Sequence, residues 1–197
     1  MNGFERRKQK KMEQIFNVSV QLFFKYGFQK VSVNEIARMA NVSPATIYNY
    51  FGTKERLYAD MLVNWMDKQL EQYESILDSE LSFLEKTRKI MLLEAKNLKI
   101  LSGEFPKLPE SDVEGLAQML ESYTEEKVKG FFIKFVAAGK QAGHIHPDLT
   151  EEVTMLYFTM FKNELGKYWG AAGEDGQALN IDQLIELFFY GLAGRDA

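Results

Sequence analysis

Apolar residues recur every three or four positions along most of the 197-residue chain. This spacing is typical of amphipathic helices, whereas the alternation of apolar and polar residues that marks strands is not sustained anywhere. Near the N-terminus, a helix that ends at Gly27 is predicted. Its inward face comprises Met12, Ile15, Phe16, Ser19, Leu22, Phe23 and Tyr26. The pattern as a whole predicts an all-α fold.

Two short helices are predicted after Gly27. Ser32 and Glu35 have the spacing of a capping box, which predicts a helix over about residues 33–40. Ser43-Pro44 supplies a capping hydroxyl and a proline suited to the first helical position, so a third helix is predicted over residues 44–51. The two helices would be joined by a turn of three residues.

That turn has the size found in helix-turn-helix units, and Asn41 tolerates the left-handed conformation that such a turn needs. In these units the second helix lies in the major groove of DNA. Only Ile47 and Phe51 form an apolar pair on the third helix. The other side chains suit phosphate and base-edge contacts: Pro44, Ala45, Thr46, Tyr48, Asn49 and Tyr50. An αα-hairpin inside a helical bundle is the structural alternative.

The rest of the chain predicts longer helices, at about residues 54–79, 80–101, 111–142, 150–169 and 182–193. With 46% hydrophobic and 26% charged residues, the composition is that of a globular protein. No cysteine is present, which excludes thiol catalysis, thiolate zinc sites and disulfides. No apolar run is long enough for a membrane span, and no signal peptide is apparent. We therefore expect a cytoplasmic protein with no membrane partner.

The net charge of −4 is unevenly distributed. Residues 1–60 hold ten Lys and Arg against five Asp and Glu, whereas residues 61–197 hold fourteen against twenty-three. A basic N-terminal part suggests a polyanionic partner, although a solvated basic helix would have the same composition. The basic run Arg6–Lys11 is expected to precede the first helix, either as an extended arm along phosphates or as a frayed terminus.

Chemistry of other kinds finds little support. His144, His146 and Asp148 are the only residues spaced like metal ligands, and no clear third ligand lies near the two histidines. No nucleophile elbow and no glycine-rich phosphate loop is present. We expect no metal, no cofactor and no enzymatic activity.

Several segments of residues 10–60 together resemble the N-terminal signature of the tetracycline-repressor (TetR) family. They are residues 27–28, 32–37, 41–43, 46–51 and 54–57. The resemblance implies about nine helices, with a three-helix DNA-binding head over residues 1–53 and a ligand-binding and dimerisation body over residues 54–197. It also implies a homodimer formed by the last two helices and release from operator DNA when a small molecule binds the body.

The resemblance also assigns DNA-facing positions. They fall on Ser32, Val33, Asn34, Ser43, Pro44, Ala45, Thr46, Tyr48, Asn49, Tyr50 and Lys54. The chain departs from the family pattern at Asn41, where glycine is usual, and at Pro44, which has no side-chain donor. Base reading is therefore expected to shift to Ala45, Thr46, Asn34 and Asn49.

Taken together, the aromatic and methionine side chains of the body suit an apolar or aromatic ligand, whereas for any single one of them an ordinary core position is the better interpretation. The candidate pocket residues are Trp65, Met66, Tyr73, Phe105, Met119, Tyr123, Phe131, Phe135, Met155 and Phe158. The candidate dimer residues are Val153, Tyr157, Met160, Phe161, Leu184, Ile185, Phe188, Phe189 and Leu192.

The resulting hypothesis is a ligand-responsive transcriptional regulator. It would bind a palindromic operator as a dimer, most simply as a repressor, and be released by a small apolar or aromatic effector. Two alternatives are a DNA-binding adaptor whose body binds a protein partner and an all-helical enzyme.

Overall fold

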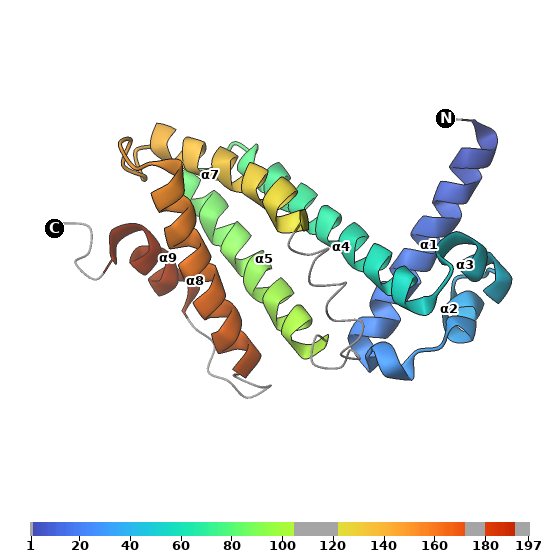
Figure 1. Cartoon of the computed structure of the whole chain (residues 1–197). Helices are drawn as coiled ribbons and strands as arrows, with labels where there is room; N and C mark the ends of the chain where they lie inside the picture. The colour runs from blue at the N-terminus through green and yellow to red at the C-terminus, as the bar shows by residue number, and fades with distance from the viewer. Residues whose placement is uncertain (1, 105–121, 172–179, 192–197) are drawn as a thin grey trace. The chain divides into compact units, whose positions relative to one another are not determined.

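The computed structural model describes residues 2–104, 122–171 and 180–191 (Figure 1). These residues form eight α-helices and no strand, which confirms the all-α prediction. The helices are α1 (Gly3–Tyr26), α2 (Val33–Met39), α3 (Pro44–Phe51), α4 (Lys54–Leu77), α5 (Phe83–Glu104), α7 (Lys129–Gln141), α8 (Glu151–Ala171) and α9 (Ile181–Tyr190). A 3-10 turn, η1 (Phe28–Lys30), follows α1, and a π-helical turn, η3 (Thr124–Val128), precedes α7.

The chain divides into two compact units. The N-terminal unit comprises Met1–Gln69 and Glu104–Tyr123, and the C-terminal unit comprises Leu70–Gly103 and Thr124–Ala197. Helix α4 therefore contributes residues to both units. The domain boundary predicted after residue 53 separates a DNA-binding part from a ligand-binding and dimerisation part. It is a division by function and not by packing, and it stays a prediction.

Helix α1 begins nine residues before the first predicted apolar position, Met12, because Asn2 caps it strongly. The Asn2 side chain accepts hydrogen bonds from the backbone amides of Phe4 and Glu5, at 3.0 and 2.9 Å. The Glu5 carboxylate accepts one from the Asn2 amide at 2.8 Å. This reciprocal pair satisfies orphan amides at the helix start, and lysine and arginine are good helix formers. The expectation that Arg6–Lys11 precedes the helix as an arm or frayed end is therefore wrong.

The core of the N-terminal unit forms where α1 meets α2, α3 and the start of α4. Five residues of α1 are buried, all of them on the predicted inward face: Ile15, Phe16, Ser19, Leu22 and Phe23. Phe23 packs against Phe28 of η1 and Tyr58 of α4, with ring centroids 5.8 and 5.2 Å apart. Burial of these aromatic rings supplies much of the apolar area that stabilises the unit.

The C-terminal unit has its own core, contributed by the end of α4, by α5 and by α7. Its buried residues are Tyr73, Leu77, Phe83, Ile90, Phe131, Phe132, Phe135 and Val136. Met155 and Phe158 of α8 and Phe189 of α9 pack against it. Within the described part of the chain, no helix is long and apolar enough to cross a membrane.

Candidate nucleic-acid interface

Both short helices begin at the predicted serine caps. The Ser32 hydroxyl accepts a hydrogen bond from the Glu35 amide at 3.1 Å, one half of the predicted capping box, and α2 starts at Val33. The Ser43 hydroxyl accepts the Thr46 amide at 3.2 Å, and α3 starts at Pro44. Each cap satisfies an amide that the helix cannot pair internally, so these caps fix where the two helices begin.

The turn between the helices depends on Asn41. This residue has a φ of 54°, the only positive φ at a non-glycine position in the described ranges. The left-handed conformation reverses the chain and lets the Val42 amide donate to the Ala37 carbonyl at 3.0 Å. Asparagine tolerates this conformation better than most residues, so the chain forms the turn without the family's usual glycine.

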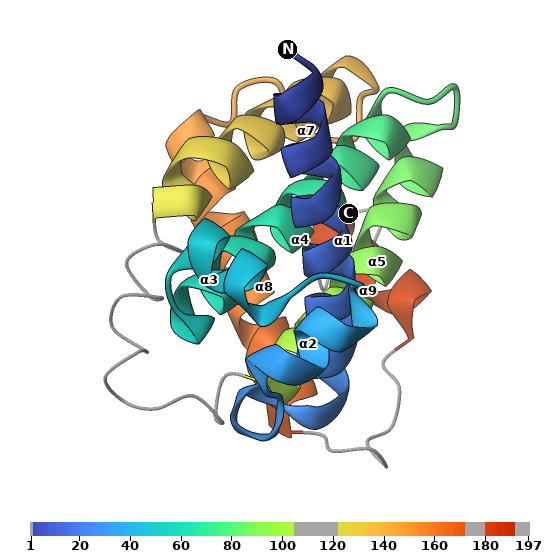
Figure 2. The same ribbon diagram turned by 90° about the vertical axis from the view of Figure 1, so that its right-hand side faces the viewer.

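Helix α3 is held on the unit by two of its eight residues. Ile47 is 1% exposed and Phe51 is 5% exposed, and the Phe51 ring lies 5.4 Å from the ring of Phe16 on α1. The rest of the helix faces outward or lies at the edge of the contact. Figure 2 shows α2 and α3 packed with α1. A helix anchored on one narrow face leaves its opposite face available for a ligand as large as DNA.

The outward face of α3 carries the predicted polar and small side chains. Pro44, Ala45, Tyr48 and Asn49 are exposed. Thr46 and Tyr50 are half-buried. The Thr46 hydroxyl lies 2.9 Å from the Ser43 hydroxyl. Tyr48 is 52% exposed, so its ring and hydroxyl are accessible to a ligand.

The remaining predicted DNA contacts lie at the starts of α2 and α4. Ser32 and Asn34 are exposed, whereas the Val33 side chain is buried, so only the Val33 backbone amide can serve an anion. Lys54 opens α4, and its ammonium lies 4.2 Å from the centroid of the Phe28 ring. Burial of this side chain lowers the pKa of Lys54. The hydroxyl of Thr53 caps α4 by accepting the Arg56 amide at 3.1 Å.

One residue of the basic run Arg6–Lys11 lies beside α3, a position that the sequence pattern did not indicate. The Lys8 ammonium lies 5.6 Å from the centroid of the Tyr50 ring. Its position became apparent only because α1 extends as a helix past the point where the predicted helix began.

The sequence of this head matches a known family. Residues 15–61 match the family described as bacterial regulatory proteins, tetR family. The match covers α2, α3 and the turn between them. Over these residues the chain is therefore similar to the TetR family.

Two curated proteins that the chain is similar to are regulators. It is 27% identical over 99 residues to the fatty acid metabolism regulator protein of Bacillus subtilis, an alignment that covers 50% of each chain. The chain thus aligns with half the length of that relative. It is 20% identical over 147 residues to the HTH-type transcriptional repressor KstR2 of Mycobacterium tuberculosis, covering 73% of this chain and 72% of the relative.

Solved structures share this all-α fold over nearly the whole chain. The fatty acid degradation regulator FadR of Bacillus halodurans is similar with a TM-score of 0.71 and 21% identity, covering 94% of this chain and 97% of that one. FadR of Bacillus subtilis, solved in complex with stearoyl-CoA, has a TM-score of 0.62 and 20% identity, covering 91% and 98%.

The candidate pocket residues fall into two groups. Tyr73, Phe131 and Phe135 belong to the C-terminal core, and Met155 and Phe158 pack against it. Trp65, Met66 and Tyr123 lie in the N-terminal unit, where the Trp65 ring packs edge-on against Phe24 of α1, at 5.3 Å. The Tyr123 hydroxyl donates to Asp67 at 3.0 Å in the same unit. Phe105 and Met119 lie outside the described residues.

A small hydrogen-bond network of three side chains, Tyr73, Glu94 and Asn97, includes one residue of the C-terminal core. The Tyr73 hydroxyl donates to a Glu94 carboxylate oxygen at 2.7 Å and accepts from the Asn97 side-chain amide at 2.6 Å. Tyr73 and Asn97 are both buried. Burial and the neighbouring Glu94 carboxylate raise the pKa of Tyr73, which keeps its hydroxyl protonated at neutral pH. Sequence periodicity could not identify this network, because its members look like isolated polar positions on two helices.

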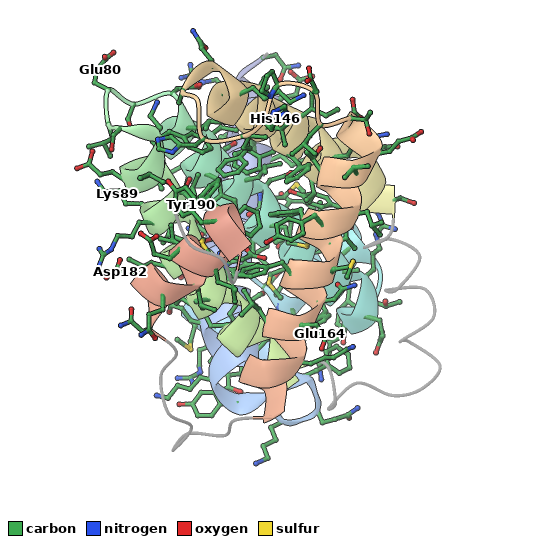
Figure 3. All side chains as sticks on the ribbon, turned by 90° about the vertical axis from the view of Figure 1, so that its left-hand side faces the viewer. Glu80, Lys89, His146, Glu164, Asp182 and Tyr190 are labelled. Carbon is green, nitrogen blue, oxygen red and sulfur yellow. The ribbon has the colours of Figure 1, made fainter. Side chains whose placement is uncertain are left out.

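The candidate dimer residues also divide. Ile185 is buried within its own chain, and Phe189 packs on the C-terminal core. Val153, Tyr157 and Met160 are exposed along α8. Phe161, Leu184 and Phe188 are half-buried, and the Phe161 and Phe188 rings lie 4.9 Å apart. Leu192 lies outside the described residues. Figure 3 shows α8, with Glu164, beside α9, with Asp182 and Tyr190.

The two histidines do not converge on a metal site. The His144 ring stacks on Phe83 with centroids 5.7 Å apart, and its Nδ1 lies 3.4 Å from the Tyr190 hydroxyl. His146 instead lies beside Asp148, at 3.9 Å. Among the residues described, no group of three or more histidine or acidic side chains could hold a metal ion.

Proposed function

We propose that this protein is a dimeric transcriptional repressor that binds a palindromic operator and is released by a fatty acyl-CoA effector. It would act as a regulator rather than an enzyme, in the cytoplasm, where its operator DNA would be found. The observation that carries the DNA-binding part is α3, a helix anchored by Ile47 and Phe51 alone and exposing Tyr48 and Asn49.

The chemistry of α3 favours the major groove. Ala45 and Asn49 lie on its exposed face, where a methyl group can contact thymine and an amide can bond the edge of adenine. Tyr48 and Lys54 supply a hydroxyl and a cation for phosphates. The positive charge of residues 1–60 would attract the duplex. These features support the assignment of α3 as the recognition helix.

An exposed apolar stripe on α8 supports the dimer. Leu156 is 62% exposed and Met160 is 58% exposed, and Val153 lies three residues before Leu156 on the same face. Leu187 of α9 is also exposed. A solvated monomer would leave these side chains in water, whereas a second copy would bury them across a two-fold axis. Two-fold symmetry in the protein matches a palindromic site.

The C-terminal core and two relatives support the proposed effector class. The B. subtilis FadR structure contains stearoyl-CoA, and a relative aligned over half its length is named a fatty acid metabolism regulator. In this chain the cluster around Phe131 and Phe135 is apolar, with the Tyr73–Asn97 group as a polar element beside it. A ligand with a long apolar chain and one polar group suits such surroundings.

The coupling between effector and operator would run through the spacing of the two recognition helices. Half-sites one turn apart require these helices about 34 Å apart, so a change of a few ångströms would weaken binding. Helix α4 carries Lys54 at its first residue and contributes Tyr73 to the C-terminal core. It therefore offers a continuous route between the two sites. The effector must bind the DNA-incompetent spacing more tightly, since equal affinity would shift nothing.

A fluorescence anisotropy titration tests the proposal. The full chain is bound to labelled operator DNA, and stearoyl-CoA is added, with free coenzyme A and a short acyl-CoA as controls. We expect release by stearoyl-CoA and none by coenzyme A, because the long chain supplies the differential burial. Unchanged anisotropy with every acyl-CoA would overturn the effector class, and failure to bind any operator would overturn the function itself.

A further inference from the structure

The first turns of α1 form a charged surface that the core of the N-terminal unit does not use. Gly3–Lys11 are exposed, and in Figures 1 and 2 this end of α1 projects beyond α3. We call this segment the α1 extension. The Asn2–Glu5 capping box holds its first turn in helical form. The extension carries five Lys and Arg residues and a single acidic residue, Glu5.

Helical spacing places four of these five basic residues on two faces. Lys8 and Lys11 continue the stripe that becomes Ile15, Ser19 and Leu22, the residues that α1 buries in the core. Where the helix leaves the core, its inward stripe therefore changes from apolar to basic. Basic side chains on this stripe are consistent with a polyanion that binds this face of the helix in the functional complex.

The position of Lys8 relates this face to the recognition helix. Its ammonium lies 5.6 Å from the centroid of the Tyr50 ring on α3, and both side chains belong to the N-terminal unit. Lys11 follows on the same stripe, one turn closer to the core. A DNA duplex held by α3 would therefore pass close to both ammonium groups, because phosphates border the major groove on each side.

The opposite face of α1 has a different neighbour. Arg6 and Lys10 share their stripe with Glu13 and Asn17. The Lys68 ammonium of α4 donates a hydrogen bond to the Asn17 side chain at 3.1 Å and lies 4.0 Å from the Glu13 carboxylate. The core end of this stripe therefore contacts the Lys68 side chain of α4. Arg6 and Lys10 form a matched control for Lys8 and Lys11, with the same charge and helix but a different face.

We propose that the α1 extension is a second DNA-binding element, in which Lys8 and Lys11 bind phosphates that flank each half-site. The proposal rests on the proposed function and deepens it, since it lengthens the footprint beyond the α2–α3 unit. The extension acts as a rigid helix and not as a flexible arm. Its contacts are with the backbone, so they add affinity without adding sequence preference.

The test compares two double variants of the full chain, Lys8→Ala with Lys11→Ala and Arg6→Ala with Lys10→Ala. Both remove two positive charges per protomer, and circular dichroism checks that helix content is unchanged. Operator binding is then measured by anisotropy over a series of salt concentrations. Each lost phosphate contact lowers the salt slope by about 0.9, so the four lysines of a dimer account for about 3.6.

We expect the Lys8 and Lys11 variant to lose this slope and the Arg6 and Lys10 variant to keep most of it. Between 50 and 200 mM salt, wild type would then lose about 150-fold more affinity than the first variant, which follows from the slope difference. Equal effects of the two variants would overturn the proposal in favour of a general field effect. An unchanged slope in the first variant would overturn it as well.

A third variant tests the helical form. Gln9→Pro keeps every charge but breaks the helix within the extension. We expect it to weaken operator binding as the Lys8 and Lys11 variant does, and full retention of affinity would overturn the rigid placement. The proposed function is tested separately, by the binding of the wild-type protein to palindromic DNA. Such binding supports the proposed function whatever the variants do. Its absence would refute the proposed function before the variants are compared.

Discussion

Replacement of Phe51 by alanine should undock the recognition helix. Phe51 and Ile47 are the only buried residues of α3, so Phe51 supplies about half of its anchorage. The ring is 5% exposed and lies 5.4 Å from Phe16, and removal of a buried phenylalanine costs about 3–5 kcal/mol. Total stabilities of about 5–15 kcal/mol leave little margin for such a loss. We expect α3 to detach before the rest of the protein unfolds.

Two measurements follow this variant. Urea unfolding at a fixed protomer concentration, observed by circular dichroism, gives the free energy of unfolding, and hydrogen exchange gives the protection of the α3 amides. Phe51→Ala should lower both and abolish operator binding. Tyr48→Ala is the matched control: its ring is 52% exposed, so stability should change by less than about 0.5 kcal/mol while operator affinity falls. An unfolding free energy within about 1 kcal/mol of wild type, with protected α3 amides, would refute the two-residue anchorage.

The other predictions concern DNA contacts, assembly and acid sensitivity. Lys54→Ala should reduce the salt slope of operator binding by about one per subunit. Asn49→Ala should instead cost about 1–3 kcal/mol of binding free energy on the preferred site and relax the sequence preference at one base position. The reverse pattern in salt and site titrations would contradict these roles. Leu156→Glu should produce monomers in sedimentation at micromolar concentration, and an intact dimer would exclude α8 from the interface. Arg88 of α5 holds the pKa of Asp182 on α9 below its ordinary value through a hydrogen-bonded ion pair of 2.6 Å. This ion pair is therefore fully formed above pH 3.8 and is lost as the pH falls through the lowered pKa of Asp182. Hydrogen exchange at the start of α9 should accelerate over that acid range, and Asp182→Asn should remove the dependence; an Asp182→Asn protein that keeps it would point to another group.

The caps and the turn could be predicted from sequence because they depend on local chemistry. Ser43 and Pro44 start α3 through one hydroxyl and one fixed φ, and Asn41 reverses the chain through its own backbone preference. The buried pair Ile47 and Phe51 follows from helical spacing alone. Each of these features involves residues within a few positions of one another, so local sequence patterns are sufficient to predict them.

Features that depend on packing between distant segments could not be predicted in the same way. The helical start at Gly3 depends on the Asn2 cap, and the basic composition that follows it is equally typical of an arm. Trp65 looks like a lining residue of the body, but its ring packs on Phe24, far away in the sequence. The Tyr73–Asn97 hydrogen bond joins α4 to α5, and no local pattern indicates it.

Selection of bound DNA from a random library tests the central claim most directly. The full chain is incubated with random duplexes, and retained sequences are amplified and read over several rounds. The account predicts one enriched site with two-fold symmetry, its half-sites about 10 base pairs apart, whose enrichment disappears with Phe51→Ala. Enrichment of no sequence, or of an asymmetric site that Phe51→Ala leaves unaffected, would contradict the assignment of α3 as the DNA reader.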